Sequence, residues 1–254
     1  MATTVMSTTT AMDTGTSIEI SVGSPAAFLG ALRLGSAALP IGAFAYSQAL
    51  EQAVAIGAVT DRHSAARWIE GMLEHSLLGL DVPVLSRIFR ALGGDPLDHT
   101  LAGDRLGEVD RWSDFLYASR PTQELRAEER QLGRSLFRWL DRQAEACAAR
   151  HLERGKPTLA AAFAVAARSL GLSHEAAALT YAFAWCEAQV GAATRLIPLG
   201  QSDAQLVLSG AIARLAAGFQ RALALEDDEL AATAPGQALL SAAHETQYSR
   251  LFRS

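Results

Sequence analysis

The sequence is poor in cysteine, histidine and lysine. Its 2 cysteines, Cys147 and Cys186, and its 6 histidines show no C-x-x-C or paired Cys/His spacing, so a zinc site of the usual local kind is not expected. Both cysteines lie in apolar stretches with helical periodicity, where a free cysteine is typical of the protein core. We therefore expect neither a bound metal ion nor a cofactor.

Long apolar runs and targeting signals are also missing. The longest apolar stretches are interrupted by Glu, Arg, Gln or Gly, well short of the roughly 20 residues that a membrane-spanning helix needs. The start of the chain is rich in Thr and Ser and has no basic region followed by an apolar run, which argues against a secretory signal. We expect a cytoplasmic protein without membrane contact, and a disordered tail over residues 1–24.

Positive charge is not in excess. The formal net charge is -5 and Lys156 is the only lysine, which argues against a nucleic-acid-binding protein with a broad basic surface. Half of the residues, 50%, are hydrophobic, so a sizeable core can form without disulfides or metal.

Catalytic motifs are absent as well. Neither Gly-x-Ser-x-Gly nor His-Glu-x-x-His occurs. The nearest approach to a phosphate-binding loop is Gly155-Lys156, but Arg150 stands where the first glycine belongs and Pro157 where Ser or Thr would bind magnesium. We therefore expect a protein that is not an enzyme.

Apolar residues recur with helical period through most of the chain. One apolar stripe runs from Trp68 to Leu77, and Asp61 precedes it as a plausible N-cap. A long helix is expected after Pro121, and a third helix should end near Gly171, with Ser173 starting the next.

The last long helix should follow the loop after Pro198. Ser202 or Asp203 could cap it, and its apolar positions include Leu206, Ala213 and Ala217. The sequence thus predicts an all-α fold, a single domain of roughly eight to ten helices. We place this domain at residues 25–236, between flexible tails at residues 1–24 and 237–254.

Five arginines recur every four residues between residues 126 and 142, and such a row forms a ridge that drifts slowly around a helix. Acidic residues beside it could form i,i+4 ion pairs, which predicts a solvated, self-paired face. An acidic docking partner is the alternative. The arginines are Arg126, Arg130, Arg134, Arg138 and Arg142, and the acids are Glu124, Glu128, Asp141 and Glu145.

Glu187 lies in the very apolar stretch 181–190, where full burial of its charge would be costly without a partner. Either it points to a polar seam or pairs with an arginine, or it lines a polar passage or a partner site.

Three segments contain combinations of residues that a generic helical domain does not require. In the first, residues 32–51, Pro40 and Gly42 mark a helix boundary, and polar side chains should project from the first turns of the helix that follows. The second is the Pro/Gly loop 198–205, and the third is the ending, 244–254. The polar residues that we single out in the first two segments are Tyr46, Ser47, Gln48, Glu51 and Gln201.

The ending is rich in residue types that anchor protein interfaces. We expect it to be disordered in the isolated protein and ordered on a partner, with Tyr248 and Arg250 as anchors. The candidate partner-binding residues in this segment are His244, Glu245, Tyr248, Ser249, Arg250 and Phe252.

These three segments, taken in order, resemble the UreF family of urease accessory proteins. The stretch 124–133 is similar to the middle segment of that family, and the resemblance extends from about Phe28 to Ser254. Ala43 and Ala45 stand where the family usually shows more variation or has glycine and serine, which is a small departure.

The resemblance implies a helical homodimer that binds UreD (also called UreH). That pair recruits the GTPase UreG and acts on the urease apoprotein, so that nickel, supplied indirectly by UreE, enters the urease active site. A direct stimulation of UreG by a polar residue near Tyr46–Glu51, or by an arginine supplied in trans, is a second hypothesis. A hydrolase with an unrecognised active site is the third.

Overall fold

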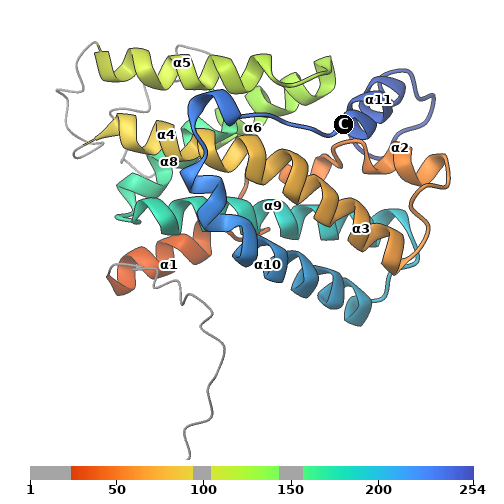
Figure 1. Ribbon diagram of the computed structural model, residues 1–254. Coiled ribbons are helices and arrows are strands. Elements are labelled where there is room, and N and C mark those ends of the chain that lie inside the picture. The colour runs from red at the N-terminus through yellow and green to blue at the C-terminus, as the bar shows by residue number, and fades with distance from the viewer. Residues whose placement is uncertain (1–23, 94–103, 143–156) are drawn as a thin grey trace, which may run out of the picture.

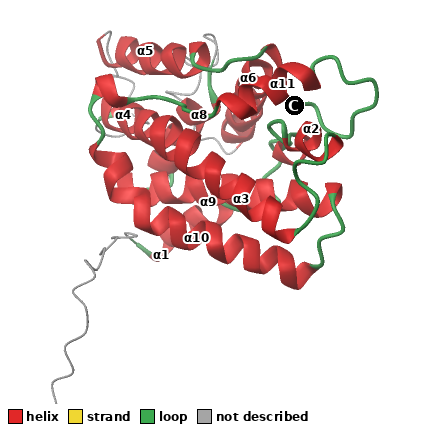
Figure 2. Cartoon of the chain, turned by 45° about the vertical axis from the view of Figure 1, so that its right-hand side comes forward, coloured by secondary structure: helices red, strands yellow, loops and turns green. Residues whose placement is uncertain are grey.

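The computed structural model describes residues 24–93, 104–142 and 157–254, and within these ranges the chain is helical without a β-strand (Figure 2). The prediction of a single all-α domain is thereby confirmed. The α-helices are α1 (Pro25–Leu34), α2 (Leu50–Ala55), α3 (Arg62–Met72), α4 (Val82–Leu92), α5 (Asp104–Ala118), α6 (Gln123–Arg142), α8 (Leu159–Ser169), α9 (His174–Leu196), α10 (Gln201–Ala224) and α11 (Pro235–His244).

A long rod forms the middle of the molecule. Helix α3 continues through a π-helical segment, η2 (Leu73–Asp81), directly into α4. The rod packs against α9 and α10, and its α4 part also contacts α5 and α8. In Figure 1, α5 covers one side of this arrangement, while α1 and α10 lie on the opposite side.

Helices α6 and α8 pack closely against each other. Every residue from Ala160 to Ala167 is buried, and small side chains let neighbouring helices approach closely. Gly133 of α6 faces this contact, since a Cβ atom there would lie 2.5 Å from the main-chain oxygen of Pro157. Only glycine fits this position.

Several helix boundaries are confirmed. The Asp61 carboxylate accepts a hydrogen bond from the main-chain N–H of Ser64 at 2.8 Å, and Ser173 caps α9 in the same way. Gly171, with φ +72°, follows the end of α8, where a left-handed residue satisfies the last carbonyl groups. Pro121 lies just before α6, as expected.

The helix expected after the loop at Pro198 is confirmed as α10, but its expected side-chain cap is not found. Gly200 is its N-cap and no side chain caps it; Asp203 instead forms an ion pair with Arg62 at 2.9 Å. Leu206 is exposed, while Val207 and Leu215 are buried. Apolar residues occupy more than one side of α10, so composition did not reveal which side packs on the rod.

By length and composition alone, α10 could cross a membrane, although we expected no apolar stretch of sufficient length. In the fold it packs along α3, η2 and α9. One such helix is weak evidence, because the core helix of a globular domain passes the same test.

The expected N-terminal tail, apart from Ser24, and the core position expected for Cys147 lie outside the described residues. Ser24 caps α1. Cys186 is fully buried, as expected, and burial raises the pKa of its thiol to about 12.

The C-terminal segment differs from the flexible tail that we expected. His244 and Ser254 are fully buried and Phe252 is 3% exposed. The end of the chain lies beside α2 and α11 (Figure 1). The physical reason is a set of buried hydrogen bonds to residues far away in the sequence.

Candidate functional site

The structure brings the first and third of the particular segments together. Tyr46, Ser47 and Gln48 do not lie in the first turns of a helix, as we expected, because α2 begins only at Leu50. They lie in an irregular stretch in which Gln48 and Ala49 have φ values of 52° and 73°. Such left-handed geometry is uncommon for residues with a side chain and is found more often at functional sites.

Ser47 and Glu51 hold the end of the chain. The main-chain N–H and the hydroxyl of Ser47 both donate to the main-chain oxygen of Ser254, at 2.9 and 2.6 Å. The Glu51 carboxylate accepts hydrogen bonds from the main-chain N–H groups of Leu251 and Phe252, at 2.6 and 2.8 Å. These contacts fix the backbone of the segment from both sides.

His244 lies between two carboxylates. Its Nδ1 is 2.6 Å from an oxygen of Glu124, and its Nε2 is 3.3 Å from an oxygen of Glu51. Arg250 also pairs with Glu124. The His244 side chain is fully buried. The carboxylates of Glu51 and Glu124 therefore take the place of the water that its ring nitrogens would otherwise contact.

Glu128 connects the end of the chain to the interior. Its two carboxylate oxygens accept hydrogen bonds from the Gln48 amide at 2.8 Å and from the Ser254 hydroxyl at 2.6 Å. The Gln48 amide oxygen in turn accepts a hydrogen bond from the Trp185 indole at 2.8 Å. Burial raises the pKa of Glu128 to about 7, although these hydrogen bonds oppose the rise.

Glu245 and Phe252 complete the attachment. The exposed Glu245 accepts hydrogen bonds from the main-chain N–H groups of Gln123 and Glu124 at 2.7 and 3.1 Å, so it caps α6 and favours its N-terminus. The Phe252 ring is buried under the Arg195 guanidinium, 4.5 Å from the ring centre.

Other residues of the same segment point outward. Tyr248 is 105% exposed and Leu251 is 54% exposed. Ser249 is exposed too, and the Arg250 side chain is 40% exposed. A rigid backbone therefore presents an aromatic, an aliphatic and a basic side chain to the solvent.

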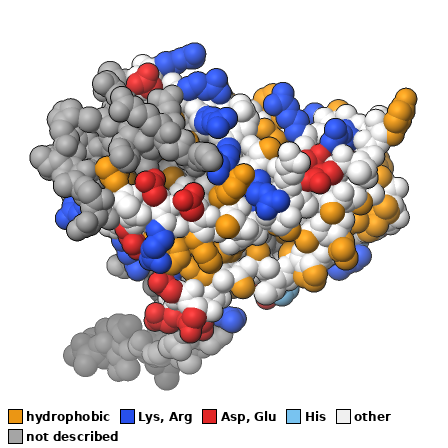
Figure 3. All heavy atoms as spheres, turned by 90° about the horizontal axis from the view of Figure 1, so that it is seen from above, with side chains coloured by type: hydrophobic (Ala, Val, Ile, Leu, Met, Phe, Trp, Pro, Cys, Tyr) orange, Lys and Arg blue, Asp and Glu red, His pale blue; other side chains and the backbone are white. Residues whose placement is uncertain are grey.

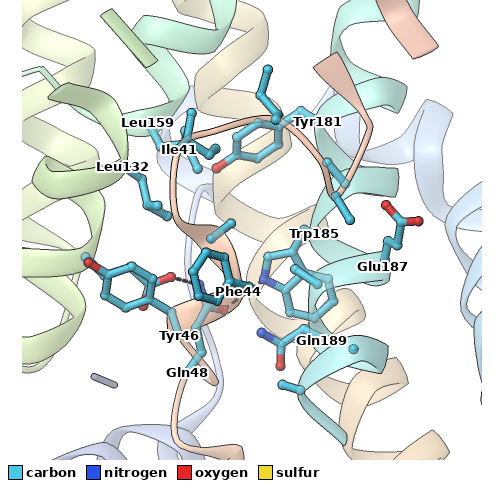
Figure 4. A pocket seen from close by; sticks show the side chains of 18 of the residues that line it. Ile41, Phe44, Tyr46, Gln48, Leu132, Leu159, Tyr181, Trp185, Glu187 and Gln189 are labelled. Atoms are coloured by element: carbon cyan, nitrogen blue, oxygen red, sulfur yellow. Dashed lines mark hydrogen bonds between the residues drawn. The ribbon is translucent and has the colours of Figure 1, made fainter. Parts of the chain in front are cut away.

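A cavity of about 260 Å³ lies behind the irregular stretch. Figure 4 shows Phe44, Tyr46 and Gln48 beside Trp185 of α9, with Tyr181 of the same helix farther along the cavity. Burial raises the pKa of the Tyr46 hydroxyl. The lining is mostly apolar, with acidic and basic groups at a few positions.

A buried ion cluster forms part of the cavity wall. Arg120 donates to Asp81 at 3.2 Å and to Glu129 at 2.7 Å, and the Tyr181 hydroxyl lies 3.4 Å from Asp81. Burial alone would lower the pKa of Arg120, but the two carboxylates raise it well above its usual value. The cluster therefore keeps its charges inside the protein as a compensated group.

Glu187 lines the same cavity and is half-buried. Its carboxyl group points away from Phe44 and Tyr46 (Figure 4). It forms no hydrogen bond or ion pair within the described ranges, so the pairing with an arginine that we considered is not found there.

Gln201 is the one singled-out residue that lies apart. It is the exposed first residue of α10 and shares no hydrogen bond with the C-terminal segment in the described parts of the chain. The sequence reasoning also missed Glu124, Glu128 and Trp185 as parts of this site. For a glutamate near the start of a helix, the local sequence does not indicate that its side chain faces inward.

We expected the arginine ridge to pair with the acidic residues beside it, and the described residues do not show this pairing. Glu124 and Glu128 face the C-terminal segment instead of the ridge, and Glu145 lies outside the described residues. Asp141 is exposed and forms no ion pair with the described part of the ridge.

Within the described residues, no group of three or more His, Cys, Asp or Glu side chains could hold a metal ion. The partner-binding role that we predicted for the site residues remains a prediction, and the buried ones now have a defined role in holding the exposed ones.

Comparisons with known proteins cover most of the chain. A family model described as UreF matches residues 59–212. A urease accessory protein UreF of Chromohalobacter salexigens is 43% identical over 235 residues, which are 92% of this chain and 98% of that protein. The UreF of Pseudomonas putida is 41% identical over 241 residues, 92% of this chain and 100% of that protein. This chain belongs to the UreF family of urease accessory proteins.

Proposed function

We propose that this chain is a scaffold in urease maturation that binds UreD (UreH) through its docked C-terminal segment. One observation carries the proposal: fully exposed Tyr248 and half-exposed Leu251 are held between buried His244 and Phe252. A segment that is already ordered loses less conformational entropy when it binds. Exposed tyrosine and arginine side chains are also common among residues that dominate binding energy.

The test is co-expression with UreD and size-exclusion chromatography with light scattering. Tyr248→Ala combined with Leu251→Asp should abolish the complex and leave the helical circular dichroism unchanged, since both side chains are exposed. Leu206→Asp with Ile212→Asp, which changes two exposed apolar residues of α10, is the matched control. Undiminished binding of the first variant would overturn the proposal.

Deletion of residues 244–254 is a less clean test than the sequence alone indicated. It would remove the buried His244 and Phe252 and leave the Glu51 and Glu124 carboxylates without these partners. Loss of the complex could then reflect damage to the fold. The point variants separate the two effects.

The scaffold recruits UreG and acts on the urease apoprotein, so that nickel supplied indirectly by UreE reaches the urease active site. Nickel is cargo in this scheme. The nucleotide chemistry belongs to UreG, which agrees with the missing phosphate-binding loop of this chain.

We further propose that two copies associate through the outer face of α1. Phe28, Leu29 and Leu32 are 48%, 63% and 56% exposed there, and neighbouring exposed apolar residues mark interfaces more often than isolated ones do. Leu29→Glu with Leu32→Glu should convert a dimer into a monomer in light scattering, while Leu206→Glu with Ile212→Glu should not. A monomeric wild type would refute this proposal.

Regulation of the GTPase is a second candidate function. Ser47 and Glu51 are buried, so they are poorly placed to reach another protein, whereas Arg250 is 40% exposed. An arginine supplied in trans can accelerate GTP hydrolysis by about 10³–10⁵-fold. Single-turnover hydrolysis by UreG with the Arg250→Gln variant should lose this acceleration, and the exposed Arg67→Gln variant is its control.

A further inference from the structure

The outward face of α6 is more basic than its sequence suggests. All three glutamates of this helix are used inside the protein: Glu124 binds His244 and Arg250, Glu128 binds Gln48 and Ser254, and Glu129 binds Arg120. Basic side chains gather on the face of the molecule shown in Figure 3. We define the arginine strip as Arg130, Arg134 and Arg138.

The strip is held in place without being neutralised. The Arg130 guanidinium lies 3.7 Å from the centre of the Tyr117 ring, and its Nε is buried without a hydrogen-bond partner. Arg134 and Arg138 are exposed, and Arg138 donates to the Ser135 hydroxyl at 3.1 Å. No carboxylate of the described residues forms an ion pair with any of the three.

Exposed acids lie on the same helix as the strip and on the neighbouring helix α5. Asp141 lies one turn beyond Arg138 on α6, and Asp114 lies one turn before Tyr117 on α5; both are exposed. The strip itself has a regular spacing, because residues four apart on a helix are about 6 Å apart along the axis and about 40° apart around it.

We propose that the arginine strip docks an acidic helical segment of a partner protein. A helix with carboxylates every four residues has the same spacing as the strip, so that successive charges can pair along both helices. A nucleic acid fits less well, because its continuous row of phosphates would also face Asp114 and Asp141. This surface is separate from the exposed side chains of the C-terminal segment, and the proposal does not depend on the binding of UreD.

The test uses the full-length protein and a fluorescent helical peptide with glutamate at every fourth position. Its binding is measured by fluorescence anisotropy at about 50 mM and about 300 mM salt, because screening weakens contacts between exposed charges. The strip variant carries Arg134→Glu and Arg138→Glu. The control carries Arg67→Glu and Arg221→Glu, two exposed arginines of α3 and α10.

We expect the peptide to bind the wild type and the control at least about tenfold more tightly than the strip variant, with a loss of affinity at the higher salt concentration. A peptide of the same composition with its glutamates clustered at one end should bind more weakly. Equal binding of the strip variant and the wild type, no binding at low salt, or preferential binding of single-stranded DNA would each overturn the proposal. Unchanged thermal unfolding of the variant excludes misfolding as the cause.

Discussion

Replacing Glu128 by glutamine should remove a pH dependence from the stability of the fold. Glu128 is 5% exposed, and burial, opposed by the hydrogen bonds from Ser254 and Gln48, raises the pKa of its carboxyl group from 4.5 to about 7. In the unfolded chain the group returns to its ordinary pKa. Between these two values the folded protein binds more protons than the unfolded protein does, so its stability falls as the pH rises.

The magnitude follows from the two pKa values. Their difference, 7 minus 4.5, is about 2.5 pH units, and each unit corresponds to about 1.4 kcal/mol. The contribution is complete below the unfolded pKa and is lost as the pH rises through the folded pKa. The wild type should therefore lose about 3 kcal/mol of unfolding free energy relative to Glu128→Gln between acid and mildly alkaline pH.

The assay is urea unfolding followed by tryptophan fluorescence, on both proteins, between about pH 5 and about pH 8. Glutamine suits the comparison because its amide can keep hydrogen bonds with Gln48 and Ser254 while remaining neutral. Asp228→Asn, at an exposed position, is the control and should show no such trend. A stability difference between wild type and Glu128→Gln that stays constant across this pH range would refute the reasoning.

Four further substitutions test the packing. Gly133→Ala should lower the free energy of unfolding by at least about 2 kcal/mol, because the new Cβ would lie 2.5 Å from a main-chain oxygen. Gly191→Ala, whose new Cβ would have nothing within 4 Å, should instead stabilise α9 by up to about 1 kcal/mol. Equal melting temperatures of the two variants would contradict this. Arg120→Met should lower the free energy of unfolding in urea by about 3–5 kcal/mol, since it leaves two buried carboxylates without their cation. An unchanged free energy of unfolding would show that the cluster is hydrated. Phe252→Ala should speed tryptic cleavage after Arg250, because it removes a ring that is 3% exposed; an unchanged cleavage rate would mean that the segment is held by its hydrogen bonds alone.

The helices were predictable because their signals are local. The caps at Asp61 and Ser173 and the left-handed Gly171 act within a few residues of the boundary that they set. For α10 the apolar residues predicted the helix but not its buried side, since residues such as Leu206 are exposed. When more than one side of a helix is apolar, only its neighbours decide which side is buried.

The sequence predicted the two segments that form the candidate site, but not that they come together in one site. Glu51 and His244 are 193 residues apart in the sequence and meet only in the fold. Composition made the ending of the chain look like a flexible tail, because its aromatic and charged residues have no local partners. The glutamates that hold it lie on α2 and α6, and nothing in the sequence indicates that those side chains face inward.

Glu128 joins the two parts of the site into one system. It lines the cavity and accepts a hydrogen bond from Ser254, so a change in its protonation acts on both the cavity wall and the end of the chain. Linkage makes this relation reciprocal: a partner that tightens the docked segment must also shift the proton affinity of Glu128. The affinity of any protein that binds Tyr248 and Leu251 should then depend on pH near neutrality, and this dependence should be absent in Glu128→Gln.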